Sequence, residues 1–314
     1  MNCLVSGATG FIGRELCHQL AARQLPFTAL SRRGGPLADG TATVAVDFCC
    51  HDVDAGLLQG VDLVFHLAGI AHQQAEDSAY EKINYQATLA LAKASEKAGV
   101  KCFVYLSSVK AMGPPAGSAV RSEEQLCAPE NAYGLSKWRA EQDLRSAFAA
   151  SSMSVIILRP ALVYGAGVKG NLATLAGAVR RGLPRPPEIG GRSMIAVQDL
   201  AGLMVQIACE PPCGVHTWIV CDGQRYSARR IYGLMRKALG KGPGVSYLPV
   251  WLWRVGAYLA DIRRGPGEGS TFDKIFGVEL YSSAALVREL PWQPEFELAD
   301  IVAEIMAAPV EKSQ

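Results

Sequence analysis

A tyrosine and a lysine four residues apart carry the clearest acid–base chemistry in the sequence. Tyr133 and Lys137 stand in the run YGLSK, within a segment (131–149) that predicts a long helix, so both side chains share one helix face. A free tyrosine hydroxyl has a pKa of about 10 and is a poor acid or base at neutral pH, but a nearby ammonium lowers that pKa. We therefore expect Lys137 to tune Tyr133 for proton exchange with a sugar or alcohol oxygen. Ser108, just after the predicted strand 101–106, is expected to orient the same oxygen.

A glycine-rich turn precedes these residues near the beginning of the chain. The run GATGFIG at 7–13 follows the predicted strand 2–6 and opens the predicted helix 11–23. In such a turn the first glycine allows the tight bend, the second lets the backbone approach a pyrophosphate, and the third lets helix and strand pack closely. The helix N-terminus adds N–H donors and the positive end of its dipole. We expect the cofactor to contact Gly7, Thr9, Gly10, Phe11, Ile12 and Gly13.

The end of the second predicted strand (27–30) bears on the choice of cofactor. An acidic residue there would bind the adenosine ribose hydroxyls of NAD. The sequence instead places Ser31, Arg32 and Arg33 at this point. Guanidinium groups suit a 2′-phosphate, so NADP(H) is favoured, while NAD(H) and a merely solvated basic turn stay open.

Short apolar strands alternate with helices through the first half of the chain. This order predicts an α/β fold of the Rossmann type, a doubly wound parallel sheet covered on both faces. Breaks rich in Gly and Pro after residue 165 predict a smaller C-terminal lobe. We expect a nucleotide-binding domain at 1–165, with segments near 190–222 crossing back to it, and a substrate-binding lobe at 166–314. The strands expected first are 2–6, 27–30, 43–46, 61–67, 101–106 and 154–158, and the longer helices are 11–23, 80–98 and 131–149.

The composition excludes several classes of function. A formal net charge of +2 gives no reason to expect a nucleic-acid partner. Nine cysteines are scattered without the paired spacing of a zinc site, so no metal is expected, and their odd number suits a reducing cytoplasm. The chain shows neither a signal peptide nor an apolar run long enough to span a bilayer. The apolar run 248–259 predicts either a helix covering the second lobe or an interfacial, partner-binding helix exposing Trp251 and Trp253.

Together these features resemble the extended short-chain dehydrogenase/reductase family, also described as NAD-dependent epimerases and dehydratases. The likeness extends over essentially the whole chain. It rests on GATGFIG (7–13), Asp47, HLAG (66–69), Asn84, YLSS (105–108), YGLSK (133–137), RPALVYG (159–165), GGRSMIAVQDLA (190–201) and ELPWQP (289–294).

The resemblance implies roles for specific residues. Ser108, Tyr133 and Lys137 would be catalytic, and Asn171 and Arg192 would contact the diphosphate of a nucleotide sugar. Lys110, beside the site, would contact substrate or be a surface lysine. The family also often dimerises through the helices 80–98 and 131–149, so a homodimer is expected. The remaining cofactor contacts implied are Asp47, Phe48, Leu67, Ala68, Gly69, Asn84, Pro160 and Val163.

Within the family, three runs are similar to bacterial C4-ketoreductases of UDP-2-acetamido-2,6-dideoxy-hexos-4-ulose in O-antigen synthesis. They are SSVKAMG (107–113), PENAYGLSKWRAEQ (129–142) and VYGAGVKGN (163–171). Dehydratases of the family carry Asp-Glu where this chain has Val109-Lys110, so no carboxylate is expected there and dehydration is disfavoured. Epimerases often carry Tyr-Gly where Met112-Gly113 stands.

The leading hypothesis is therefore an NAD(P)H-dependent reductase acting on the C4 ketone of a UDP-sugar. A UDP-hexose or UDP-N-acetylhexosamine 4-epimerase is the alternative enzyme. A non-catalytic NAD(P) sensor on the same fold is the alternative of another class, and the presence of both Tyr133 and Lys137 speaks against it.

Overall fold

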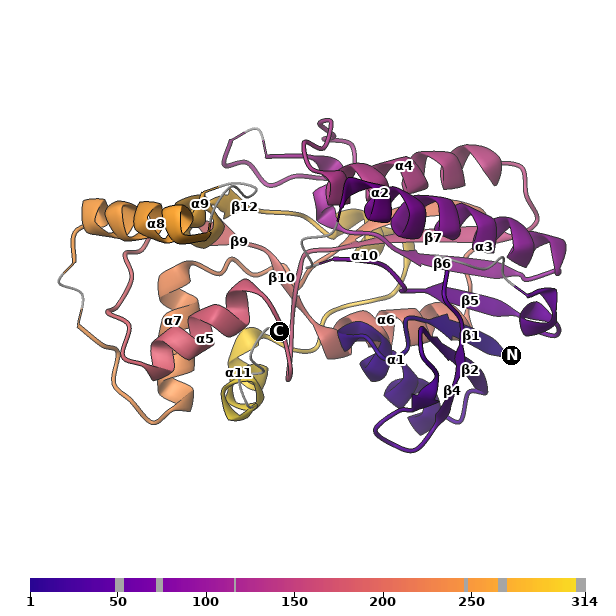
Figure 1. Ribbon diagram of the computed structural model, residues 1–314, viewed down its shortest axis with the longest axis horizontal. Coiled ribbons are helices and arrows are strands. Elements are labelled where there is room, and N and C mark those ends of the chain that lie inside the picture. Colours follow the sequence, from indigo (N-terminus) through magenta and orange to yellow (C-terminus); the bar gives the residue numbers. More distant parts are fainter. Residues whose placement is uncertain (49–53, 72–75, 116, 246–247, 265–269, 309–314) are drawn as a thin grey trace.

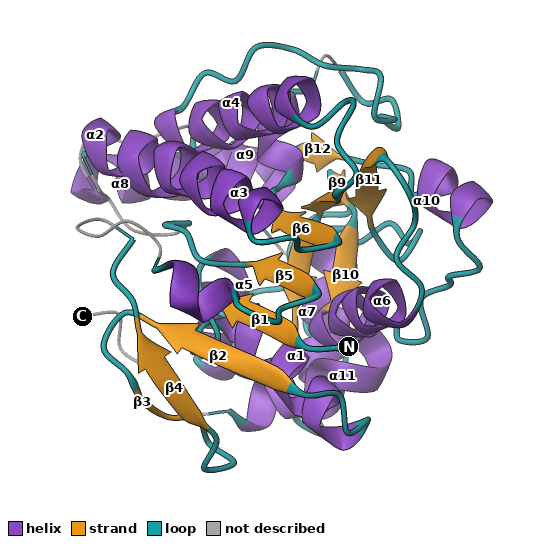
Figure 2. Cartoon of the chain, turned by 90° about the vertical axis from the view of Figure 1, so that its right-hand side faces the viewer, coloured by secondary structure: helices purple, strands orange, loops and turns teal. Residues whose placement is uncertain are grey.

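The computed structural model describes residues 1–48, 54–71, 76–115, 117–245, 248–264 and 270–308. Its larger part is an eight-stranded sheet in the order β11-β7-β6-β5-β1-β2-β4-β3 (Figures 1 and 2). Every pair of neighbours in it is parallel except β3 with β4. The strands are β1 (Cys3–Ser6), β2 (Phe27–Ser31), β3 (Gly35–Pro36), β4 (Ala42–Ala45), β5 (Leu63–His66), β6 (Cys102–Leu106), β7 (Ser154–Pro160) and β11 (Val215–Val220).

Helices cover both faces of this sheet because successive strand residues point to opposite sides. In β1, Cys3 and Val5 join the core that includes Leu16 of α1, whereas Leu4 joins the core that includes Leu91 of α3. Burying each such leucine stabilises the fold by roughly 1.5–3 kcal/mol. One face carries α1 (Phe11–Ala22) and α6 (Val197–Cys209), and the other α3 (Ala87–Lys97) and α4 (Ala132–Ala147). The predicted parallel Rossmann sheet is confirmed.

The helix expected at 80–98 is more irregular than its sequence indicates. It begins as α2 (Asp77–Tyr80), widens to a π-helical turn η2 (Glu81–Gln86), and continues as α3. The π turn contains the buried Asn84, whose side chain bonds to Ile70 instead of to its own helix. Such π turns often mark functional sites.

The crossing-back segment supplies both α6 and β11, and β11 extends the sheet beside β7. A short helix, α10 (Ala284–Glu289), packs against β11, so residues from far along the chain return to the nucleotide-binding part. Two 3-10 turns complete this part, η1 (Ala55–Leu58) and η3 (Val109–Met112).

The smaller lobe has its own core, in which Tyr164, Tyr232 and Ile301 are buried. Its helices lie at the opposite end of the molecule from the N-terminus (Figure 1). Two small parallel ladders, β8 with β10 and β9 with β12, connect it to the rest. Its elements are β8 (Leu162–Tyr164), α5 (Asn171–Arg180), β9 (Gly191–Arg192), β10 (Met194–Ala196), α7 (Ala228–Ala238), α8 (Val250–Arg264), α9 (Thr271–Phe276), β12 (Val278–Glu279) and α11 (Leu298–Ala307). Among the described residues no helix is both long and apolar enough to cross a bilayer.

Candidate active site

The glycine turn between β1 and α1 is packed so tightly that side chains cannot be added. Gly7 has a φ of +73°, and a Cβ on it would lie 2.7 Å from the backbone nitrogen of Ala68. A Cβ on Gly13 would lie 2.2 Å from the carbonyl oxygen of Gly7. Close packing of the first helix turn against the loops after β1 and β5 therefore requires glycine at both positions.

The N-terminus of α1 is open toward solvent. Thr9 and Gly10 are exposed and Phe11 and Ile12 half-buried, and Gly10 caps the helix without a side-chain hydrogen bond. The structure describes every residue of the first turn of α1, and none of them is acidic. Its N–H groups and helix dipole therefore suit a phosphate group. The turn fits the pyrophosphate of a dinucleotide.

The residues after β2 divide into buried and exposed side chains. Ser31 is buried and its hydroxyl bonds to Thr43 at 2.8 Å, while Thr43 donates to the carbonyl of Gly35 at 2.7 Å. Arg32 and Arg33 are exposed beyond the strand end. Arg32 and Arg33 thus present positive charge where an adenosine ribose is expected.

The neighbouring strand ends bring the other expected cofactor contacts to the same sheet edge. Phe48, after β4, meets His66 edge to face with ring centres 5.7 Å apart. His66 itself is buried between Ser6 and Thr88, and burial lowers its pKa to about 3, so it is a neutral packing residue. Asp47, Leu67 and Ala68 are half-buried, Gly69 is exposed, Pro160 is buried at the end of β7, and Val163 lies on β8 opposite Ile195.

Tyr133, Lys137 and Glu141 lie at successive four-residue steps along α4. The helix begins where the Asn131 side chain accepts a hydrogen bond from Gly134 N at 2.6 Å. Ser108, which caps η3 after β6, lies close enough to Tyr133 that its side chain acts to lower the pKa of the phenol. The structure thus brings together the two hydroxyls that the sequence places on separate elements, beside the buried Lys137.

Lys137 is bound within the protein rather than to Tyr133. Its ammonium donates to the carbonyl of Leu106 at 2.8 Å and lies 4.7 Å from the centre of the Tyr105 ring. Burial lowers the pKa of Lys137 to about 7, against the opposing effect of Glu141. A lysine that titrates near neutral pH is typical of functional sites.

The predicted lowering of the Tyr133 pKa is wrong for this structure. Burial raises that pKa above its usual value, and the nearby Ser108 side chain opposes the rise only in part. The Lys137 ammonium donates its hydrogen bond to the carbonyl of Leu106. Tyr133 therefore stays protonated near neutral pH, as a proton donor requires.

Asn84 holds the loop after β5 against α4. Its side-chain oxygen accepts from Ile70 N at 2.8 Å, and its side-chain nitrogen donates to Ile70 O at 2.9 Å and to the Ser136 hydroxyl at 3.3 Å. A Cβ on Gly69 would lie 2.9 Å from that oxygen and 3.4 Å from the Lys137 ammonium. Asn84 thus positions the loop next to Lys137, and its direct contact with a cofactor stays a prediction.

The substrate side contains a carboxylate that sequence reasoning missed. Lys110 on η3 donates to both oxygens of Glu279 on β12, at 2.8 and 3.0 Å. β12 pairs with β9, which places Glu279 opposite Arg192. Burial raises the pKa of Glu279, but Lys110 and Arg192 hold it below its usual value. Positions 109 and 110 themselves hold no carboxylate, and a distant strand brings one beside η3.

The remaining substrate residues lie on the smaller lobe. Arg192 donates to the carbonyl of Lys274 at 2.7 Å, and its pKa is lowered by burial. Asn171 is the exposed first residue of α5. The structure joins Lys110 and Arg192 through Glu279 but shows no contact between Asn171 and that group among the described residues.

A second missed group lies under the catalytic residues. The buried Glu141 carboxylate accepts from the Ser107 hydroxyl at 2.5 Å and from the guanidinium of Arg159 at 2.5–3.1 Å. Ser107 and Ser108 are neighbours, so this network fixes the strand end that bears the candidate catalytic serine. The signal in the sequence was the position of Glu141, eight residues after Tyr133 on the same helix face.

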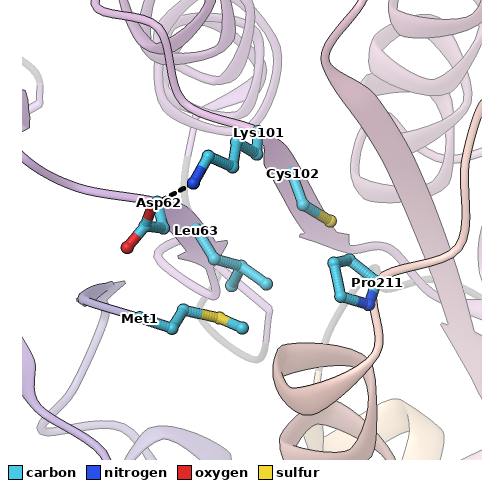
Figure 3. A pocket seen from close by; sticks show the side chains of 6 residues that line it. All are labelled: Met1, Asp62, Leu63, Lys101, Cys102 and Pro211. Carbon is cyan, nitrogen blue, oxygen red and sulfur yellow. Dashed lines mark hydrogen bonds and ion pairs between the residues drawn. The ribbon is translucent and has the colours of Figure 1, made fainter.

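A small hollow shown in Figure 3 lies at the opposite edge of the sheet. Leu63 and Cys102, the first residues of β5 and β6, line it together with Met1, Asp62, Lys101 and Pro211. Ligands of open parallel sheets bind at the carboxyl ends of the strands, so this hollow is not the candidate site. Among the described residues no group of three potential metal ligands gathers.

The fold and this edge of the sheet define a dinucleotide-binding enzyme of the Rossmann class. Residues 3–219 match the model of the NAD dependent epimerase/dehydratase family. The chain is 30% identical over 306 residues to a UDP-glucose 4-epimerase of Vibrio cholerae, an alignment covering 93% of this chain and 90% of that protein. The chain therefore belongs to the NAD dependent epimerase/dehydratase family, and the expected membership is confirmed.

Two further relatives show the range of the family. An N-acetyl-alpha-D-glucosaminyl-diphospho-ditrans,octacis-undecaprenol 4-epimerase of Escherichia coli O157:H7 is 25% identical over 318 residues, covering 100% of this chain and 92% of that protein. The solved structure of MoeE5 in complex with UDP-glucose and NAD superposes with a TM-score of 0.77 at 25% identity, covering 98% of each chain.

Proposed function

We propose that this protein reduces the C4 ketone of a UDP-2-acetamido-2,6-dideoxy-hexos-4-ulose with a reduced nicotinamide nucleotide, as a step of surface polysaccharide synthesis. The observation that carries the proposal is the proximity of Ser108 to Tyr133, beside buried Lys137, at the sheet edge that also bears the glycine turn. The relatives act on sugars bearing a diphosphate, by their names, and MoeE5 binds both UDP-glucose and NAD.

The residues of the glycine turn would hold the dinucleotide, because the open N-terminus of α1 and the glycine cradle fit its pyrophosphate. When bound, the nicotinamide supplies the hydride. Ser108 orients the ketone oxygen, and Tyr133, protonated near neutral pH, donates a proton to that oxygen as it gains charge. Lys137 fixes the strand end through Leu106 and is positioned to hold the nicotinamide ribose.

Charge on the substrate side fits a nucleoside diphosphate. Lys110 and Arg192 share a single carboxylate, Glu279, so the group retains net positive charge. Guanidinium and ammonium groups bind phosphate oxygens through charge-assisted hydrogen bonds. Asn171, at the N-terminus of α5, would add a polar contact from the smaller lobe.

The arginines after β2 favour reduction over epimerisation. An epimerase uses its cofactor in both directions and retains it, whereas a reductase exchanges oxidised for reduced cofactor in each cycle. Arg32 and Arg33 are exposed where a 2′-phosphate would lie, which suits NADPH as an exchangeable reductant. The epimerase nevertheless stands as the second candidate, because the Vibrio cholerae relative bears that name.

One assay separates the two enzymes. The purified protein is given the 4-keto sugar nucleotide with NADPH or NADH, and oxidation of the cofactor is compared with the sugar product formed. Reduction consumes one cofactor per sugar. Interconversion of C4-epimeric UDP-sugars without net cofactor oxidation would refute the reductase and establish the epimerase.

Variants connect the activity to the site. Tyr133→Phe should lower the rate by about 10²–10⁴-fold while leaving cofactor binding intact. Tyr85→Phe is the matched control, since the Tyr85 hydroxyl bonds to Asp143 away from Ser108. Undiminished cellular function of the Tyr133 variant would favour a non-catalytic sensor.

The cofactor preference has its own test. Arg32→Ala combined with Arg33→Ala should weaken binding of NADPH more than that of NADH, and Arg23→Ala, an exposed arginine at the end of α1, serves as control. Equal or tighter binding of NADH by the unmodified protein would contradict the NADP(H) preference.

A further inference from the structure

Helix α8 lies at the outer end of the smaller lobe (Figure 1) and exposes several large apolar residues. The side chains of Trp251, Tyr258 and Ile262 are 62%, 65% and 61% exposed, and Val255 and Leu259 are exposed between them. These five positions follow the spacing i, i+4, i+7, i+8 and i+11, which places them on one face of a helix about 22 Å long. Soluble surfaces rarely gather so many large apolar side chains in one element without a partner.

The opposite face of α8 is firmly packed, so this stripe of five apolar residues belongs to a structured helix. Trp253 meets Phe276 edge to face with ring centres 5.7 Å apart, and Ala257 is buried. Asp261 accepts hydrogen bonds from the backbone and the hydroxyl of Thr271. Trp253 is half-buried and Trp251 is exposed, so α8 both covers part of the smaller lobe and presents one of its two tryptophans to solvent.

The charge of α8 favours an anionic partner. Its sequence holds three arginines, at 254, 263 and 264, and one acidic residue, Asp261. Asp261 is engaged with Thr271 on α9, while Arg254 is exposed beside the stripe. An apolar face with an indole and a phenol, flanked by basic residues, is the pattern of a helix lying in the plane of a membrane interface.

We propose that the exposed face of α8 docks this protein onto an anionic phospholipid surface. Trp251, Tyr258 and Ile262 would enter the boundary between headgroups and acyl chains, and Arg254 would meet lipid phosphates. Docking of a second copy through the same face is less favourable, because it would bring together two helices whose sequences each carry net positive charge. The proposal does not depend on which sugar or cofactor the active site uses.

Vesicle flotation tests this proposal with the full chain. The protein is mixed with vesicles of phosphatidylcholine alone or of phosphatidylcholine and phosphatidylglycerol in equal parts. We expect the protein to bind the anionic vesicles. Salt or neutral lipid removes the attraction between arginines and lipid phosphates, and partitioning should weaken roughly fivefold for each arginine affected. A protein that stays with the soluble fraction in both mixtures overturns the proposal.

A double variant locates the surface. Trp251→Ser with Tyr258→Ser should weaken partitioning at least about tenfold, since two large side chains no longer leave water. Val120→Ser, at an exposed apolar residue elsewhere, should bind like the unmodified chain. Unchanged melting temperature and reductase activity show that the double variant is folded. Vesicle binding unaffected by the double variant, or a dimer that dissociates in it without any vesicle binding, refutes the proposal.

Discussion

Glu141 offers a quantitative test of how the structure supports the active site. Its carboxylate is fully buried and is bonded to the Ser107 hydroxyl and to the fully buried guanidinium of Arg159. The perturbation is Glu141→Leu, which removes the charge and the acceptor at similar volume. Arg159 is then left as an uncompensated charge in the interior.

The expected loss of stability is large. Removing one partner of a buried ion pair costs about 3–5 kcal/mol. At an unfolding entropy of about 2.1 cal/mol/K per residue, that loss lowers the melting temperature of a chain of this size by about 5–8 °C. Glu141→Leu together with Arg159→Met removes both charges. The double variant should therefore lose much less free energy of unfolding than the two single variants lose when their losses are added.

The assay is equilibrium or thermal unfolding of the four proteins of this cycle. Glu81→Leu is the control, because it breaks the exposed ion pair of Glu81 with Arg139 and should cost no more than about 1 kcal/mol. Glu141→Leu as stable as this control, or losses at Glu141 and Arg159 that simply add, would show that the buried pair does not support the site as argued.

Three further predictions concern other parts of the site. Burial lowers the folded-state pKa of Lys137 to about 7 from 10.5, so the unfolded chain binds the extra proton between these values. The free energy of unfolding should therefore rise with pH across that range in the unmodified chain, and Lys137→Met should abolish this rise. Denaturant titrations that give both proteins the same dependence on pH would contradict the lowered pKa. Gly13→Ala should abolish cofactor binding and lower the free energy of unfolding by several kcal/mol. Gly233 has open space around it on α7, so Gly233→Ala should raise that free energy by up to about 1 kcal/mol. Calorimetry and cofactor titration distinguish the two variants. Lys110→Met should raise KM for the sugar nucleotide about fivefold with kcat nearly unchanged, whereas Lys101→Met, at the other edge of the sheet, should alter neither; equal effects of the two variants on steady-state kinetics would remove Lys110 from the substrate site.

The parts of the fold that depend on local sequence were predictable. The turn at Gly7 and Gly13 and the alternation of short apolar strands with helices placed the sheet and its glycine turn correctly. The spacing of Tyr133 and Lys137 likewise placed both on one helix face. In each case the information lies within a few residues, because helix and strand periodicity and glycine sterics act over that range.

Other features of the site depend on contacts between distant segments. Glu279 reaches Lys110 only because β12 pairs with β9, and the pKa of Tyr133 rises because residues from several elements bury it. The sequence by itself determined the nucleotide-binding fold and singled out the candidate acid–base residues. The tertiary structure alone decided their protonation and charge partners, because burial and Coulomb interactions sum over neighbours that the folded chain brings together from far along its length.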